Sequence, residues 1–288
     1  MTVLTLVLSL ASAWSAAHDD IRAQIEAVTA QISENPADAR LFLKRGQLYQ
    51  LHKAWKAGLA DFDRAARLKP SLDSVDLARG RLLFDAGRLE PAEASLNRFL
   101  RKHADAGAAW LTLGRVHGRL GRYAEAALDF TRAIDHLNEP KPEYYLERAR
   151  ALAALGNDAI DSALRGLDDG MQRLGSLVTL QTYAIKLNLR VRDYDAALQR
   201  LETISARSRR KERWLAYRGD ILMSAGRNAD ARDTYELALA AIGVLPARHR
   251  MTKAVRDLDD HIRAALASPD AGKANPSIPK FVAKAHGK

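Results

Sequence analysis

The stretch from Leu43 to Pro70, LKRGQLYQLHKAWKAGLADFDRAARLKP, has the apolar spacing of a helix, yet Gly46 lies inside it. A glycine in a helix interior costs about 0.5–1 kcal/mol relative to alanine, so a compensating interaction is expected there. A missing side chain lets another helix approach closely, and the dispersion attraction between the two helices then offsets the lost propensity. Gly46 therefore predicts that a second helix packs against this point.

The same small position recurs at a fixed interval. After Gly46, steps of 34, 34, 35, 35 and 35 residues lead to Gly80, Gly114, Ala149, Ala184 and Gly219. Twelve residues after each member comes another small or short residue, at Gly58, Ala92, Ala126, Asp161, Ala196 and Ala231. Glycines that can end a helix stand between the two positions, at Gly87, Gly121, Gly156 and Gly226. The chain is therefore predicted to repeat a helix–turn–helix unit.

These residues resemble the tetratricopeptide repeat (TPR) family, a 34-residue hairpin with large residues at positions 4, 11 and 24 and small ones at 8, 20 and 27. The first repeat fits closely, with Phe42, Gly46, Tyr49, Gly58, Phe62, Ala65 and Pro70 in the family's places. The third departs at His117, the fourth has Asp161 and Arg165 where small and large apolar residues belong, and the fifth has an extra turn residue. The resemblance implies an all-α, right-handed superhelical solenoid of about six hairpins with flanking capping helices.

The pattern divides the chain into five predicted segments. They are a signal peptide (1–17), an N-terminal capping helix (18–36), the TPR array (37–243), a C-terminal capping helix (244–267) and a disordered basic tail (268–288). The capping helices are expected because each carries one apolar stripe, which ends with Ile32 in the first and runs from Met251 to Leu266 in the second.

Residues 1–17 carry no charge, and their apolar run is too short to span a bilayer as a helix. Small residues follow at a spacing typical of signal peptidase sites, and cleavage is expected after Ala17. This predicts a periplasmic or secreted protein. A secretory leader usually begins with Lys or Arg, which this one lacks, so a retained membrane anchor and an apolar start that folds onto the first helix remain alternatives.

The composition limits the chemistry available. The chain has no cysteine, a formal charge of +10 and no phosphate-binding loop, nucleophile elbow or helical metal-binding histidine pair. We expect no enzyme activity, cofactor, metal site or nucleic-acid partner, and membrane contact only through an uncleaved leader or the basic tail. His18 would become the N-terminus after cleavage and could chelate copper, although an ordinary surface histidine is the simpler interpretation.

In the family, the first helices of the hairpins line a concave groove that binds segments of other proteins. The resemblance places Arg81, Arg115 and Arg150 at the same groove position of three consecutive repeats, with Lys44 and Arg119 near the same surface. Such a stripe suits an acidic peptide, a C-terminal carboxylate or another anion. Alternatively, these side chains form only a solvated face.

Two other sets of residues on the first helices lead to narrower conclusions. The family's carboxylate clamp for chaperone C-termini is absent, because its positions hold Leu43, Gln47, Ala78, Ala108 and Thr112. A second arginine series comprises Arg45, Arg79, Arg148 and Arg218. We expect it to be structural, with Arg45 paired to Asp61 across its own hairpin.

Together these features predict an exported, non-enzymatic TPR adaptor that binds a peptide segment of a partner protein, with acidic segments among the candidates. The alternative is a structural component of an envelope complex, or a scaffold that self-associates through its convex face. The sequence leaves the oligomeric state open.

Overall fold

The computed structural model describes residues 20–267, and the regular structure in this range is entirely helical. The chain divides into two compact units, Met1–Pro140 and Lys141–Lys288. The predicted signal peptide and basic tail lie outside the described residues. The predicted all-α helical-repeat class is confirmed in both units.

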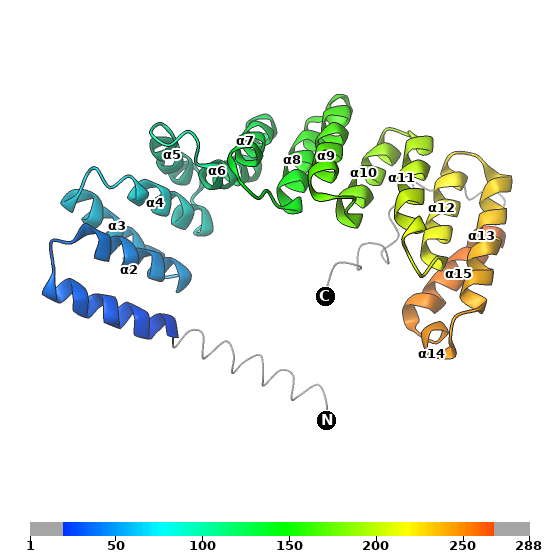
Figure 1. Cartoon of the computed structure of the whole chain (residues 1–288), viewed down its shortest axis with the longest axis horizontal. Coiled ribbons are helices and arrows are strands. Elements are labelled where there is room, and N and C mark those ends of the chain that lie inside the picture. The colour runs from blue at the N-terminus through cyan, green and yellow to red at the C-terminus, as the bar shows by residue number, and fades with distance from the viewer. Residues whose placement is uncertain (1–19, 268–288) are drawn as a thin grey trace. The chain divides into compact units, whose positions relative to one another are not determined.

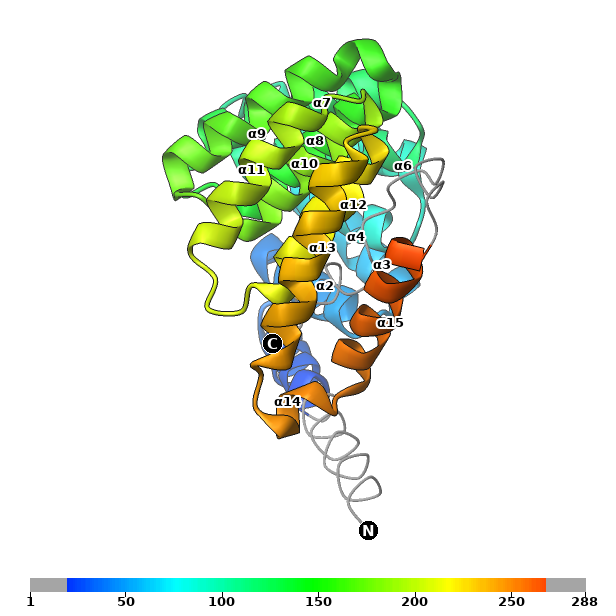
Figure 2. The same cartoon turned by 90° about the vertical axis from the view of Figure 1, so that its right-hand side faces the viewer.

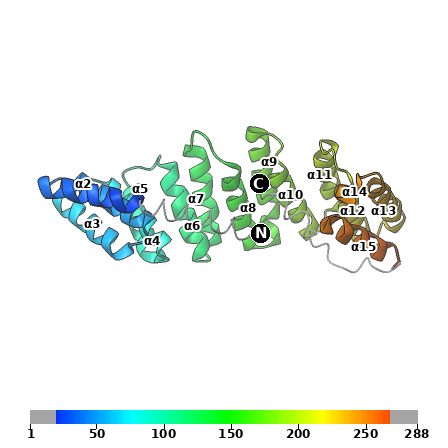
Figure 3. The ribbon, with the colours of Figure 1, turned by 90° about the horizontal axis from the view of Figure 1, so that it is seen from below.

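Unit 1 begins with a helix at residues 20–34, on which Val28 and Ile32 are buried. Three hairpins follow: α2 (Ala39–Leu51) with α3 (Trp55–Leu68), α4 (Ser74–Asp85) with α5 (Leu89–Leu100), and α6 (Gly107–Arg119) with α7 (Tyr123–His136). The two helices of each hairpin run side by side, and each first helix also contacts the next one, α2 with α4 and α4 with α6 (Figure 1). Unit 1 is therefore a stack of hairpins whose first helices are neighbours (Figure 3).

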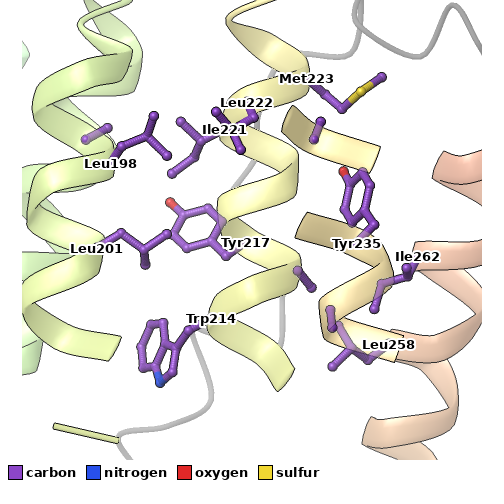
Figure 4. Close-up of a cluster of buried hydrophobic side chains, with 14 of the residues drawn as sticks. Leu198, Leu201, Trp214, Tyr217, Ile221, Leu222, Met223, Tyr235, Leu258 and Ile262 are labelled. Atoms are coloured by element: carbon purple, nitrogen blue, oxygen red, sulfur yellow. The ribbon is translucent and has the colours of Figure 1, made fainter. Parts of the chain in front are cut away.

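Unit 2 contains three further hairpins and a closing segment. The hairpins are α8 (Pro142–Leu155) with α9 (Ile160–Leu174), α10 (Val178–Arg190) with α11 (Tyr194–Ala206), and α12 (Glu212–Ser224) with α13 (Asn228–Gly243). After α14 (Ala247–Arg250), the helix α15 (Lys253–Ala267) packs on α12 and α13 (Figure 2). Leu258 and Ile262 of α15 complete an apolar cluster with Tyr235 of α13, so α15 covers the end of the last hairpin (Figure 4).

The small residues on the first helix of a hairpin lie where a large side chain of the second helix packs against the first. A Cβ atom added at Gly46 would overlap the ring of Phe62. At Gly80 it would lie 2.7 Å from Cγ of Leu96, a distance too short for two carbon atoms. The close helix approach predicted from Gly46 is thus confirmed, and its partner is the large residue of the second helix.

The turns inside five of the six hairpins in residues 20–267 use left-handed backbone, whereas Gly156 in the fourth has φ of 132° and ψ of −176°. Gly87, Gly121 and Gly226 have φ of 75°, 77° and 74°, as the turn signal predicts. Lys53 (φ 59°) and Arg192 (φ 62°) adopt the same conformation in the first and fifth hairpins. A side chain makes that conformation unfavourable by about 1 kcal/mol, so the packing of these two hairpins must hold the turn in place.

The fourth hairpin corrects the predicted register. Asp161 and Arg165 are exposed, and Ala163 and Leu167, each two residues further on, are completely buried in their place. A 3₁₀ turn, Asn157–Ala159, precedes α9 and lengthens the connection. The longer connection shifts the buried face of α9 by two residues, which explains why the family pattern fails there.

His117, the departure in the third repeat, is buried between two carboxylates. Its Nδ1 lies 2.7 Å from Oδ2 of Asp129 on α7, and its Nε2 lies 3.3 Å from Oε1 of Glu93 on α5. Arg132 pairs with Asp129 and Arg122 with Glu93. The Asp129 hydrogen bond raises the pKa of His117 most, the contact with Glu93 adds to it, and burial opposes both. His117 therefore joins all three helices, and its raised pKa favours the protonated form.

Two glycines of α6 provide a matched test of the packing. A Cβ at Gly114 would lie 2.9 Å from Cδ1 of Phe130, whereas one at Gly118 would meet nothing closer than 4.0 Å. We expect Gly114→Ala to lower the free energy of unfolding by about 1–3 kcal/mol through overpacking. Gly118→Ala should leave it unchanged or raise it by up to about 1 kcal/mol, because alanine favours a helix. Urea unfolding measures both, and equal effects of the two substitutions would contradict this packing.

The His117 cluster predicts a pH dependence of stability. Because folding raises the pKa of His117, the stabilisation is fully present below its ordinary pKa of about 6.5 and is lost as the pH rises through the raised value. We expect His117→Gln to cost about 1–3 kcal/mol at pH 6 and less at pH 9. Denaturant unfolding of both proteins at the two pH values gives this difference. A difference that is equal at both pH values would show that the imidazolium does not act.

Candidate functional site

The first helices of unit 1 present a continuous set of accessible groove positions. We call this surface the first-helix face. It consists of Lys44, Gln47 and Leu51 on α2, Leu77, Arg81, Phe84 and Asp85 on α4, and Thr112, Arg115 and Arg119 on α6. Each of these residues is exposed or partly exposed, and the three helices contact one another in order.

Arg81 lies on the middle helix of this face. Its side chain is half-buried, yet it makes no hydrogen bond or ion pair with any residue in the range 20–267. Burial lowers the pKa of its guanidinium, and the charge of Asp85, one turn further along α4, acts in the opposite direction. A partly desolvated guanidinium without a bonded counter-ion favours the approach of an anion.

The other cations of the first-helix face differ in their exposure and in their contacts. Lys44 is exposed and forms no ion pair within the described part of the chain. Arg115 is partly exposed at the position on α6 that corresponds to Arg81 on α4. Arg119 donates from Nη1 to the carbonyl oxygen of Phe84 at 3.1 Å, and its guanidinium carbon lies 5.1 Å from the centroid of the Phe84 ring. Arg119 therefore contributes charge while joining α6 to the end of α4.

The first-helix face also has an apolar component that charge alone does not reveal. Leu51 is 64% exposed, and Leu77 and Phe84 are partly exposed. On the same two helices, Nε2 of Gln50 donates to Oδ2 of Asp85 at 2.6 Å and so holds that carboxylate in place. The three apolar residues occupy groove positions of the repeat, which is the signal that could have identified them. The face is thus basic and apolar together.

Arg150 belongs to unit 2. Its guanidinium carbon lies 5.7 Å from the ring centroid of Tyr183 on α10. Burial raises the pKa of Tyr183, and the charges of Arg150 and Arg190 oppose that rise. Of the five predicted site residues, the structure places Lys44, Arg81, Arg115 and Arg119 on neighbouring helices of unit 1. Arg150 is held by an aromatic ring in the other unit.

Three of the four arginines in the second series are structural, as predicted, whereas Arg218 is partly exposed and its side chain forms no hydrogen bond or ion pair among residues 20–267. Nε and Nη2 of Arg45 donate to the two carboxylate oxygens of Asp61, both at 2.8 Å. Arg79 pairs with Asp63 at 2.7 Å, and Arg148 donates to the carbonyl oxygen of Gly166 at 2.9 Å. These three guanidiniums are used inside the helix stack and leave the first-helix face to the other series.

Residues 20–267 offer neither a metal site nor a membrane span. In that range no cluster of three or more histidine, cysteine or acidic side chains has the arrangement of a metal site. No helix in the described part combines the length and the apolar character needed to cross a bilayer. His18 lies outside the described residues.

Comparisons with known proteins agree on the fold. A model described as "Tetratricopeptide repeat" matches residues 77–139 and 111–165, and one described as "Tetratricopeptide repeat-like domain" matches residues 159–255. No curated protein matches the chain.

Solved TPR structures are similar at low identity. YrrB, described as "a TPR protein with an unusual peptide-binding site", is 21% identical with a TM-score of 0.53, covering 76% of this chain and 100% of its own. The C-terminal part of a TPR repeat-containing protein from Cytophaga hutchinsonii is 11% identical, with a TM-score of 0.63. This match covers 83% of the present chain and 94% of the Cytophaga chain. These likenesses concern the fold. With the two family models spanning residues 77–255 and six hairpins in the described residues, the chain belongs to the tetratricopeptide repeat family.

Proposed function

We propose that the protein is a non-enzymatic scaffold whose first-helix face binds an extended segment of a partner protein, and that this segment carries acidic and apolar side chains. The observation behind this proposal is the half-buried guanidinium of Arg81, which has no hydrogen bond or ion pair among residues 20–267. Part of the desolvation needed for an ion pair has already occurred in the free protein. A carboxylate placed there forms charge-assisted hydrogen bonds at a smaller further cost.

The surroundings of Arg81 favour a peptide over a small anion. Lys44 and Arg115, on the two neighbouring helices, supply charge on either side, so acidic residues spaced along a segment can meet successive repeats. Leu51 and Phe84 supply apolar contact between these charges. The fold supports the same class of ligand, because TPR proteins bind other proteins, and the structurally similar YrrB is described as having a peptide-binding site.

Export is part of this proposal. The uncharged apolar run at the N-terminus, followed by small residues up to Ala17, is typical of a cleaved leader. The partner is then another periplasmic or secreted protein.

An assembly role is the second candidate, and exposed leucines on second helices favour it. Leu128 on α7 and Leu237 on α13 are each 59% exposed. Exposed apolar side chains of this size can contribute to contacts between copies or with a larger complex. Sedimentation over a range of concentrations separates the candidates, because a strict monomer excludes self-association.

Charge reversal on the first-helix face tests the leading proposal. We expect Arg81→Glu with Arg115→Glu to weaken binding of an acidic, leucine-containing peptide probe at least tenfold, because two attractive pairs become repulsive. Fluorescence anisotropy measures the affinity, and circular dichroism checks that the helices remain.

The matched control reverses Arg67 and Arg101, two exposed arginines of unit 1 that lie outside the first-helix face and whose side chains make no hydrogen bond or ion pair within residues 20–267. This control changes the net charge equally and should bind the probe almost as well as the original protein. Equal weakening in both variants would attribute binding to net charge alone, and undiminished binding in the first would remove the face from the proposal.

Leader processing is tested on the protein isolated from the cells that produce it. We expect N-terminal sequencing to begin at His18, because cleavage after Ala17 removes the apolar run. A sequence that begins at Met1 would refute cleavage. Recovery of such an intact chain from membranes would support the retained anchor instead.

A further inference from the structure

One end of unit 2 collects basic side chains from two separate connections. The first connection joins α11 to α12, and the second runs from the end of α13 through α14 to α15. Residues that flank the two connections belong to one apolar cluster, namely Ile204, Trp214, Ile242 and Val255. Both connections are found at the lower end of their hairpins in two views (Figures 1 and 2). We name this surface the basic edge; it comprises Arg207, Arg209, Arg210, Lys211, Arg248 and Arg250.

The basic edge has almost no compensating negative charge. Neither residues 203–211 nor residues 237–256 contain an aspartate or a glutamate. The side chains of Arg207, Arg209 and Arg248 are exposed and make no hydrogen bond or ion pair with any residue in the described range. These three guanidiniums are available to an external anion.

The other three members of the basic edge bond to nearby groups of the protein and so fix the conformation of the two connections. Arg210 pairs with the buried carboxylate of Glu212. Lys211 donates to the carbonyl oxygen of Ser205 at the end of α11 at 2.6 Å, and Arg250 donates to that of Gly243 at 2.9 Å. The edge is therefore held in a defined conformation by half of its own cations.

Two apolar side chains project from the same edge. Val244 is 84% exposed and Met251 is 68% exposed, the two highest values among the large hydrophobic residues of the described part of the chain. They flank α14, with Arg248 and Arg250 between them. A single exposed hydrophobic residue is ordinary, but the two most exposed ones on the same edge as Arg207, Arg209 and Arg248 indicate a surface that contacts a partner.

We propose that the basic edge docks onto an anionic lipid bilayer, with the arginines at the phosphate headgroups and Val244 and Met251 inserted between them. Val244 and Met251 are too exposed to form part of a pocket. Side chains of this kind can insert into the flat, deformable surface of a bilayer. Apolar insertion beside basic residues is the pattern of interfacial membrane binding. A nucleic acid would neutralise the arginines but leave the valine and methionine in water.

A fluorescent probe on the edge tests insertion directly in the full-length protein. Because the chain has no cysteine, Met251→Cys can carry a single environment-sensitive label. We expect its emission to shift to shorter wavelength with vesicles of phosphatidylcholine and phosphatidylglycerol, but not with phosphatidylcholine alone. Leu128→Cys, on a unit 1 residue that is 59% exposed and lies outside the first-helix face, is the control and should show no shift. The absence of a shift at Met251, an equal shift with neutral vesicles, or an equal shift at Leu128 would overturn the proposal.

Charge variants test the electrostatic part. We expect Arg207→Glu, Arg209→Glu and Arg248→Glu together to reduce partitioning into the anionic vesicles by at least about 100-fold, since each basic residue near such a surface contributes about a factor of five. The control reverses Arg67, Arg88 and Arg101, which are exposed in unit 1, and should retain most of the binding. An equal reduction in both variants would mean that net charge, and not the basic edge, drives the binding.

A nucleic-acid arm uses a short DNA duplex with the variant Val244→Ser, Met251→Ser, which removes both apolar side chains without changing the net charge. Loss of vesicle binding in this variant supports the proposal. Tight duplex binding that survives the substitution, without vesicle binding by the original protein, would assign the edge to nucleic acid and overturn it.

Discussion

The ring of Phe62 occupies the space that a side chain at residue 46 would need, and close fits of this kind hold the hairpins together. Leu96 fits against Gly80, Phe130 against Gly114 and Tyr235 against Gly219 in the same way. Each unit consists of hairpins stacked on their neighbours, so no larger core compensates when one of these fits is disrupted. In each hairpin the second helix covers one side of the first helix. The opposite side of the first helices in unit 1 remains accessible and forms the first-helix face.

Most of this fold could be predicted from the sequence because the constraint is local and periodic. The buried register of the fourth hairpin could not be predicted, since the 3₁₀ turn before α9 shifts it in a way that composition does not reveal. There the fit is reversed: a Cβ at Gly170, on the second helix, would lie 2.7 Å from the ring of Tyr145 on the first. In the fifth hairpin Ala197 is fully buried, which agrees with the one-residue insertion expected in its turn.

The sequence predicts where the residues of the candidate site lie, but not the contacts of their side chains. Repeat spacing locates Arg81 and Arg115 on the first helices, but the state of each side chain depends on the adjacent repeat. Gln50 meets Asp85, and Arg119 meets Phe84, at a sequence separation of 35, about one repeat length. Such contacts depend on how successive hairpins stack, which a spacing pattern cannot specify. The half-burial of Arg81 and the stacking of Arg150 on Tyr183 could not be predicted for the same reason.

A double-mutant cycle between Gly46 and Phe62 tests the packing constraint most directly. We predict that Gly46→Ala destabilises the protein much less when Phe62→Leu has already removed the ring, with a coupling free energy of about 1 kcal/mol or more. Urea unfolding of the four proteins provides the measurement. Additive effects, within about 0.5 kcal/mol, would contradict the claim that the absent side chain makes room for this ring.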